Sequence, residues 1–357
     1  MAGGATTTAL VTTVCKHGGL GNIASGYMTT EALNKQMQDV KQILSHNRFG
    51  VNVMVPTEPD ETIGDLEKAK DIVLEQQKEL HKKHDENLLS IETIHFNPLT
   101  YSDILQDYEE KISAILDAKP AVVSFVFGVP DRNILQEFKR RGIITIGTAT
   151  TVEEGIKIED SGMNAVIAQG FEAGGHRGTF LHKEDDHGSH VGLMPLICGM
   201  KDRLTIPIIA AGGISTGKQI AASILLGASA VQLGTAFLVT NESGVSVCYK
   251  EAICNSTEDH TCITKVFSGK YARGIKNSFI EALSTPENIS SVLDFPLQHQ
   301  LTSHLRKDAS SLENTDYLAL WAGQGIRYIK HRSAVEELMN SLSNELNHVL
   351  PHWKELL

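Results

Sequence analysis

Short apolar runs alternate with amphipathic stretches along most of this chain, and no other feature limits its fold as strongly. Several runs, such as AVVSFVFG at 121–128, are apolar at nearly every position, which is typical of strands buried on both faces of a parallel sheet. Parallel strands need a crossover between them, and the amphipathic stretches supply it. Seven runs are predicted to be strands: 20–27, 49–56, 121–128, 143–148, 165–170, 206–213 and 230–238. Helices are predicted between them, among others over 30–44, 134–141, 152–161 and 217–226.

This alternation predicts an α/β fold, and two architectures of that class fit it. One is a (β/α)8 TIM barrel, which needs eight strands, and the other is a doubly wound open sheet, which does not. We expect the barrel, with an added helical domain. Residues 6–16 have the pattern of a helix that precedes the first visible strand. We therefore expect the first barrel strand to be missing from this sequence.

Two stretches exceed the repeat and suggest how the chain is divided. Residues 57–120 are mostly charged and helical, and they separate two strands by far more than a usual connection. Near the end, 265–283 has the pattern of a hairpin or loop followed by a helix, and Ser333–Leu350 carries a helical apolar stripe. We expect a cofactor-binding barrel over 1–240, with 57–120 as a helical insertion. Residues 241–357 are then a mainly helical segment that completes the barrel and covers its site.

Charge and composition exclude several kinds of partner. The chain has 32 Lys and Arg against 43 Asp and Glu, a net charge of −11, and it has no basic block for a nucleic-acid backbone. No apolar run approaches the length of about 18 residues that a membrane span needs, and no basic residue precedes the first apolar stretch as in a signal peptide. Five scattered cysteines fit reduced thiols, so a cytoplasmic location is expected, and a homodimer is compatible with the sequence.

Glycines gather where the predicted strands end, which is where barrel enzymes keep their sites. IPIIAAGGI carries Gly212 and Gly213 ahead of a predicted helix, and the next run, VQLGTAF, carries Gly234 and Thr235. Each glycine alone could mark a tight turn. Two successive glycine-bearing strand ends, however, favour a phosphate-bearing cofactor held by backbone N–H groups.

The most informative stretch is AQGFEAGGHRGTF, at 168–180. A buried run ends at Gln169, and two glycines then precede His176 and Arg177. A histidine on a glycine-rich loop above a barrel suits a general base, because its ordinary pKa lies near neutrality. The alternative is a surface histidine on a mobile loop, and the flanking glycines and Arg177 favour the catalytic interpretation.

Several stretches together resemble the nitronate monooxygenases, and more closely their class I members: AQGFEAGGHRGTF, FGVNVMVP, IPIIAAGGI, VQLGTAF, FSGKYARGIKN and WAGQG. EAGGHRG is specific, whereas AAGGI and GTAF occur in several FMN barrels. The resemblance covers nearly the whole chain. It implies a (β/α)8 barrel with bound FMN and no metal. It also implies the oxidation of alkyl nitronates, such as propionate 3-nitronate, with O₂ to carbonyl compounds and nitrite or nitrate, with His176 acting at the substrate.

The same resemblance implies the residues that contact FMN: Asn52, Gln169, Gly174, Gly212, Gly213, Gln232, Leu233, Gly234 and Thr235. An amide at a strand end offers a donor and an acceptor to the isoalloxazine edge. Because nitronates are anions, Arg177, Lys270 and Arg273 are candidates to orient the substrate. Arg177 is equally a candidate for a structural ion pair.

Other polar clusters carry no metal prediction. One has the composition of a solvated loop and comprises His182, Glu184, Asp185, Asp186, His187 and His190. Another, with Cys254, His260 and Cys262, lacks the close spacing of zinc ligands. Trp321 in WAGQG either stacks near the flavin or anchors the last helices, and we favour the second.

Two other functions stay open at this point. An FMN-dependent, NAD(P)H-using enoyl-thioester reductase would share the barrel and the glycine–histidine loop. The other is an inactive remnant without flavin, since members of the family begin with a strand such as PIIQAPMAGG whereas this chain begins at MAGG. A barrel without that strand would leave unpaired backbone groups at two edges.

Overall fold

Seven parallel strands form a curled sheet in the computed structural model, which describes residues 1–83, 94, 96–181 and 189–353. The strands are β1 (Asn22–Ala24), β2 (Gly50–Met54), β3 (Val122–Val126), β4 (Ile144–Ala149), β5 (Ala165–Gln169), β7 (Ile208–Ala211) and β8 (Ala230–Gln232). Each pairs with its neighbours in parallel, and their order follows the chain from β1 to β8. A doubly wound sheet would reverse this order, so the fold is the predicted TIM-barrel type, with β1 and β8 at the edges.

All seven predicted runs contain a strand, most of them shorter than predicted, and the last run also contains a helix. Residues 230–238 do not form one strand, because β8 ends at Gln232 and a short helix, α9 (Thr235–Leu238), follows. Gly234 lies between them with φ −118° and ψ −70°, outside the extended region. The chain therefore turns at Gly234, directly after the strand.

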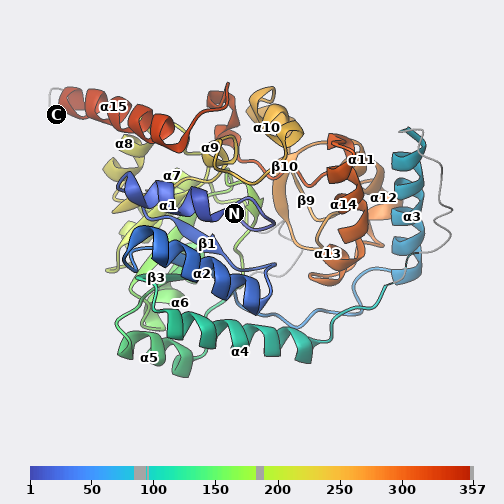
Figure 1. Cartoon of the computed structure of the whole chain (residues 1–357), viewed down its shortest axis with the longest axis horizontal. Helices are drawn as coiled ribbons and strands as arrows, with labels where there is room; N and C mark the ends of the chain where they lie inside the picture. Colours follow the sequence, from blue (N-terminus) through green and yellow to red (C-terminus); the bar gives the residue numbers. More distant parts are fainter. Residues whose placement is uncertain (84–93, 95, 182–188, 354–357) are drawn as a thin grey trace.

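Helices surround the sheet (Figure 1). Those of the barrel are α1 (Thr8–Lys16), α2 (Thr30–Leu44), α5 (Arg132–Arg140), α6 (Val152–Asp160), α7 (Leu193–Lys201) and α8 (Gly217–Leu225). Several begin after a threonine whose hydroxyl accepts a hydrogen bond from the first turn, as Thr29 does for α2 and Thr216 for α8. These N-caps stabilise the first turn, so each helix begins directly after its threonine.

The insertion after β2 contains two helices, α3 (Leu66–Lys83) and α4 (Tyr101–Ala118), which belong to different hydrophobic cores. Ile112 and Ile115 of α4 pack into the barrel core, whereas Val73 and Leu80 of α3 pack with the C-terminal segment. Figure 1 shows α3 far from the barrel, beside the C-terminal helices. The insertion thus links the barrel to the rest of the chain.

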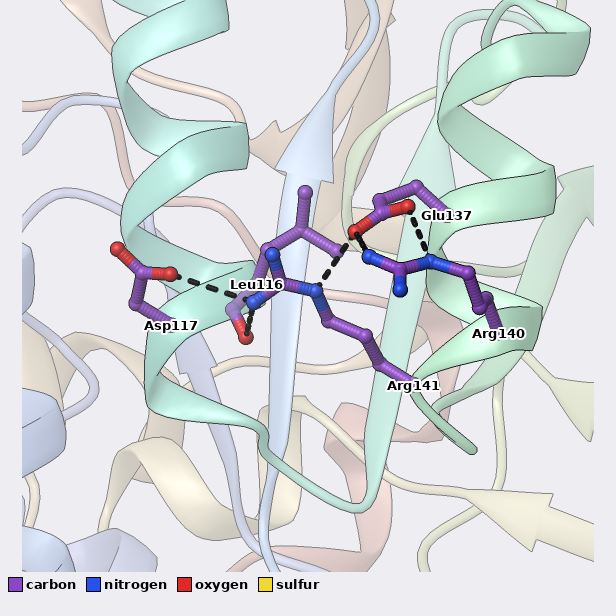
Figure 2. Close-up of polar contacts among 5 residues, drawn as sticks. All are labelled: Leu116, Asp117, Glu137, Arg140 and Arg141. Carbon is purple, nitrogen blue, oxygen red and sulfur yellow. Dashed lines mark hydrogen bonds and ion pairs between the residues drawn. The ribbon is translucent and has the colours of Figure 1, made fainter.

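An ion-pair network holds α4 against α5 (Figure 2). Arg141, just after α5, donates to Glu137 Oε1 at 2.8 Å, to the carbonyl of Leu116 at 2.8 Å and to Asp117 Oδ1 at 3.2 Å. Arg140 donates to both oxygens of Glu137. These hydrogen bonds lower the pKa of Glu137 to about 2, so the carboxylate stays charged in the network.

The C-terminal segment contains a hairpin that begins at Thr261, before the stretch 265–283 predicted as a hairpin or loop followed by a helix, and mostly short helices. A second sheet joins β6 (Gly175–His176), β10 (Ala272–Ile275) and β9 (Thr261–Thr264) in antiparallel pairs. The helices are α10 (Val247–Cys254), α11 (Ser278–Leu283), α12 (Pro286–Ile289), α13 (Leu297–Leu301), α14 (Ser303–Ser311) and α15 (Val335–Trp353), with 3-10 turns at Glu258–His260, Thr315–Tyr317 and Gln324–Tyr328. The predicted terminal helix, α15, packs on α8 and α1. None of the helices in the described ranges has the length and apolar character to cross a membrane.

Candidate functional site

His176 is held above the barrel by the pairing of β6 with β10. The loop leaves β5 at Gln169, and His176 then lies opposite Ala272 in the second sheet. Gly174 is required there, since a Cβ would lie 2.5 Å from the backbone nitrogen of Gly323. The glycine-rich loop is therefore pressed against the WAGQG segment, and this contact fixes the position of the histidine.

His176 and Ser268 share a hydrogen bond of 2.8 Å between Nε2 and Oγ. Ser268 Oγ also lies 3.0 Å from the carbonyl oxygen of Lys270, to which it can donate. The hydroxyl has one proton, so it donates either to that carbonyl or to Nε2. In the first case His176 carries its proton on Nε2 and Nδ1 is an acceptor, and in the second Nδ1–H is a donor.

Aromatic rings surround His176. The ring centroids of Trp321, Phe295 and Phe127 lie 5.5, 5.9 and 6.0 Å from that of His176. Phe127, directly after β3, has φ +73°, which is unusual for a bulky residue and typical of functional sites. The Nζ of Lys270 lies 4.7 Å from the centre of the Phe127 ring. Trp321 contacts the histidine and also the ring of Phe267 in the C-terminal core, at 5.8 Å, so either of the two roles considered for it stays a prediction.

Burial lowers the pKa of His176 to about 3, and the positive charges of Lys270 and Arg306 add to this effect. The imidazole is consequently neutral near pH 7. The same two charges create a positive potential at the ring, and such a potential attracts a small anion.

Arg177 stabilises the loop by hydrogen bonds to its backbone. It is 1% exposed, and its guanidinium donates to the carbonyls of Gly170 at 2.6 Å, Gln169 at 3.3 Å and Ser189 at 3.4 Å. Gln169 is engaged in the same loop, because its Nε2 donates to the carbonyl of His176 and its Oε1 accepts from Gly178 N–H at 2.7 Å. Arg177 is thus buried in the loop, where backbone carbonyl groups and the side-chain amide of Gln169 accept its hydrogen bonds.

Arg273 is likewise buried, at 3% exposed. It donates to the carbonyl of Phe171 at 3.1 Å and to Thr261 Oγ1 at 3.0 Å, and its guanidinium lies over the Phe171 ring. Of the three cations predicted to orient substrate, Lys270 therefore has the strongest geometric support, since its Nζ lies over the ring of Phe127, which itself contacts His176.

The two glycine pairs lie side by side, because Ala211 of β7 pairs with Gln232 of β8. Gly212 and Gly213 have φ +121° and +70°. Four backbone N–H groups at these strand ends have no hydrogen-bond acceptor among the described residues: those of Gly212, Gly213, Gly234 and Thr235. Such unpaired donors fit the phosphate of a nucleotide cofactor.

Several N–H groups at the N-terminus of α8 have acceptors within the protein. Gln219 accepts from the N–H groups of Ser215 and Thr216, and Glu345 of α15 accepts from Gly217 N–H at 2.9 Å. The N–H groups of Gly217 and Gln219 therefore have acceptors within the protein. The glycine turns still offer donors to an anion.

The remaining predicted cofactor residues lie in the middle of β2 and at the end of β8. Asn52 donates from Nδ2 to Ser124 Oγ at 3.0 Å, and its Oδ1 has no donor among the described residues, so it can accept from a cofactor N–H. Gln232 is exposed at the end of β8, and Leu233 follows it.

The histidine–acid cluster set aside above falls mostly on residues 182–188, which lie outside the described residues. His190 is described, and its ring lies 4.7 Å from that of Phe171. Within the described ranges, no three His, Cys, Asp or Glu side chains are grouped so as to hold a metal ion.

Comparison with known proteins identifies the family. The model of the family described as nitronate monooxygenase matches residues 1–345. The chain belongs to the nitronate monooxygenase family. Two relatives called "Probable nitronate monooxygenase", from Staphylococcus aureus strains MRSA252 and JH9, are each 38% identical over 349 residues, covering 98% of this chain and 93% of theirs.

Solved structures agree with this nitronate monooxygenase assignment. Nitroalkane oxidase from Streptomyces ansochromogenes aligns with a TM-score of 0.84 and 35% identity, over 99% of this chain and 95% of that one. FabK from Thermotoga maritima aligns with a TM-score of 0.73 over 99% and 94% of the two chains, but at 24% identity it shows the fold alone. As a member of the nitronate monooxygenase family, this chain is an oxidoreductase. The family implies a flavin cofactor, a small-molecule substrate and O₂.

Sequence reasoning missed three neighbours of His176. Ser268 lies in the FSGK motif, which carried the resemblance without a role for the serine. Phe127 belongs to an apolar run and is therefore expected in the core. Its positive φ cannot be recognised from the sequence. Phe295 has no sequence signal, because it reaches His176 only through the tertiary fold.

Proposed function

We propose that this protein binds FMN and oxidises alkyl nitronates, such as propionate 3-nitronate, with O₂ to a carbonyl compound and nitrite or nitrate. The proposal rests on one observation above all. His176 is neutral and lies in an aromatic shell, within the positive potential of Lys270 and Arg306. Such a site accepts a small anion without a permanent ion pair.

The pKa of His176 supports a nitronate rather than a neutral nitroalkane as the substrate. A general base works best when its pKa lies near the working pH. With a pKa of about 3, His176 is too weak a base to remove a carbon-bound proton efficiently near neutrality. A nitronate has already lost this proton, so the histidine only has to orient it.

Ser268 allows the neutral His176 to orient a nitronate by a hydrogen bond. When its hydroxyl donates to Nε2, His176 carries its proton on Nδ1 and can donate a hydrogen bond to a nitronate oxygen. An anion beside the ring stabilises this tautomer, and the carbonyl of Lys270 then gives up the hydroxyl proton. Lys270 adds positive charge near the ring.

FMN, when bound, supplies the electron transfer between the nitronate and O₂. In this proposal the N–H groups of Gly212, Gly213, Gly234 and Thr235 hold its phosphate, and Asn52 accepts from its ring edge. Gly174, Gln232 and Leu233 line the same end of the barrel. Gln169 contributes by keeping the loop of His176 in place.

Anaerobic mixing of the purified holoprotein with substrate tests the proposal. Addition of propionate 3-nitronate should bleach the flavin absorbance, and O₂ should restore it. Bleaching by NAD(P)H but not by a nitronate would instead identify an enoyl-thioester reductase. Denaturation should also release one FMN per chain, and protein without flavin would support the inactive remnant.

Location and assembly belong to the same proposal. The five cysteines are free thiols, which supports a cytoplasmic location. A homodimer stays a prediction, and sedimentation of the holoprotein would test it.

A further inference from the structure

Lys250 is a buried lysine to which the proposed mechanism gives no part. It lies in α10, it is 4% exposed, and its Nζ donates to the carbonyl oxygens of Thr240 at 2.7 Å and Ser243 at 3.0 Å. Within the described ranges, no carboxylate lies within ion-pair distance of this ammonium group. A buried ammonium group is costly unless acceptors bind its protons. Lys250 is therefore held by the turn to which these two carbonyls belong, and it holds that turn in return.

The turn, residues 240–244, comes directly after one side of the phosphate corner. Only the four residues of α9 and one more separate it from Gly234. Thr240 Oγ1 donates to the carbonyl of Phe237 at 2.9 Å, and Phe237 N–H donates to the carbonyl of Gly234 at 2.9 Å. A continuous series of hydrogen bonds thus joins Lys250 to Gly234, whose own N–H group has no acceptor among the described residues.

The same turn also holds the N-terminal glycine loop, residues 1–5. Gly244 N–H donates to the carbonyl of Ala5 at 3.1 Å, and a Cβ on Gly244 would clash with the carbonyl oxygen of Gly4. At the other end of the loop, Met1 Sδ lies 3.8 Å from the position that a Cβ of Gly234 would occupy. The loop therefore connects the turn to Gly234 by a second route.

The other side of the phosphate corner is linked to the turn through α15. Asn241 N–H donates to the carbonyl of Ser333 at 2.9 Å, and the carboxylate of Glu242 accepts from Val335 N–H at 3.1 Å. The helix α15 packs in turn on α8, which follows the other glycine pair. Both sides of the corner are therefore connected to the turn that Lys250 holds.

We propose that Lys250 is a positioning residue for the cofactor phosphate. Its ammonium group binds two carbonyls of the turn and fixes the turn against α10, so the N–H groups of Gly234 and Thr235 keep their orientation. The inference rests on the proposed function, in which these groups hold the phosphate of FMN. The flavin ring is placed at Asn52 in that proposal, so the effect of Lys250 should be confined to the phosphate.

Riboflavin, which has the ring system of FMN but no phosphate, separates positioning from general stability. The flavin-free full-length chain is titrated with both compounds, and the change in flavin fluorescence gives each dissociation constant. Lys250→Met leaves two buried carbonyls without their donor, and the FMN dissociation constant should rise at least about tenfold. That of riboflavin should change by less than about twofold. An equal rise for both flavins, or no rise for FMN, would overturn the inference.

Lys111→Met is the matched control. Lys111 of α4 is likewise buried, at 5% exposed, and its Nζ lies 2.6 Å from Asp107. The substitution removes a buried ammonium group that does not belong to the turn. It should lower the free energy of unfolding and leave the affinities for FMN and riboflavin unchanged. A selective loss of FMN affinity in this variant as well would contradict the assignment to Lys250.

Gly244→Ala tests the same arrangement and decides the matter if Lys250→Met fails to fold. Gly244 is exposed, and the added Cβ would displace the loop at Gly4 while Lys250 stays in place. The FMN dissociation constant should rise about fivefold, with riboflavin binding unchanged. Unchanged FMN binding would show that the turn does not control the phosphate corner, and the inference would be wrong.

Turnover keeps this inference apart from the proposed function. A selective loss of FMN affinity in Lys250→Met, with nitronate oxidation by the wild-type holoenzyme, supports both. The same selective loss without turnover of any nitronate rejects the proposed reaction and leaves the role of Lys250 intact. Nitronate turnover by a wild type that binds FMN and riboflavin equally would retain the reaction and reject the role of Lys250.

Discussion

Nε2 of His176 lies 2.8 Å from Oγ of Ser268, although the two residues are 92 positions apart in the chain. The pairing of β6 with β10 brings them together, and Arg177 N–H, donating to the carbonyl of Tyr271 at 2.8 Å, reinforces it. Ser268 is 1% exposed, so water cannot replace its hydroxyl. The tautomer of a neutral histidine is therefore controlled by one buried serine.

Removal of this hydroxyl should weaken substrate binding more than it slows the chemistry. In Ser268→Ala, no group donates to Nε2, so the Nδ1–H tautomer that would bind a nitronate loses its support. We expect kcat/KM for a nitronate to fall about tenfold, mainly through KM, as for the loss of one hydrogen bond of roughly 1.4 kcal/mol. Steady-state kinetics of the holoenzyme measure this split.

Ser268→Cys and Ser256→Ala are the controls for this effect. A thiol is a weaker donor of similar size, so Ser268→Cys should fall between the wild type and alanine. Ser256 is also buried and donates to the carbonyl of Ala252 at 2.7 Å, away from His176. Ser256→Ala should lose stability and keep kcat/KM. Equal kinetics of the Ser268→Ala and Ser256→Ala variants would contradict the role of Ser268.

The charge of Lys270 should contribute to the binding of the anion. Lys270→Met removes a positive charge that lowers the pKa of His176, so this pKa should rise and KM for a nitronate should increase about fivefold. Added salt should raise KM of the wild type and affect the variant less. Lys276→Met is the control, since Lys276 pairs with Glu281 at 3.0 Å on the exposed surface. A KM that responds equally to both substitutions would refute the proposal.

Two half-buried histidines should make the fold sensitive to acid. The pKa of His176 is lowered to about 3 and that of His299 to about 2, chiefly by burial. Unfolded histidine titrates near 6.5, so between pH 6.5 and 3 the unfolded chain binds more protons and stability rises with pH. At pH 5 each of these two histidines should therefore bind one proton when the chain unfolds, about two protons in all.

Calorimetry at pH 5 in buffers of different ionisation enthalpy measures this proton uptake. His176→Gln and His299→Gln should each lower it by about one proton. The exposed His331 provides the control. His331→Gln should leave the proton uptake that is due to His176 and His299 unchanged. An uptake that is the same in all three variants would show that the two histidines are accessible to protons in the folded state.

The barrel was predictable because its strands are buried on both faces, which leaves long apolar runs such as the one that contains β3. The glycine pairs were predictable for a related reason. A turn at φ +121° or +70°, as at Gly212 and Gly213, demands glycine, and glycine is visible in the sequence.

Contacts across the fold were not predictable in this way. Arg177 and Arg273 were candidates to orient the substrate, and a positive charge in a sequence does not show which way its side chain faces. Both are buried against carbonyl groups of the loop. Phe295 approaches His176 only because α13 packs beside the hairpin, a placement that no local pattern encodes.

Gly213→Ala should reduce FMN retention through the phosphate corner. Gly213 has φ +70°, where alanine is strained, and its Cβ would lie 3.0 Å from that of Glu172. The turn would shift, and with it an N–H group proposed to bind the phosphate. We expect stability to fall by about 1 kcal/mol and the FMN dissociation constant to rise at least tenfold. Fluorescence of released flavin during dialysis measures the second effect.

Gly142→Ala separates strain from cofactor binding. Gly142 has the same φ of +70°, and a Cβ there would meet nothing within 4 Å, at a turn between α5 and β4. Both variants should therefore lose the stability that a positive φ costs, and Gly213→Ala should lose somewhat more because of its contact with Glu172. Only Gly213→Ala should lose flavin, since Gly142 lies outside the proposed phosphate corner. If both variants retain FMN equally, the phosphate does not depend on the turn at Gly213, and the assignment of this corner is wrong.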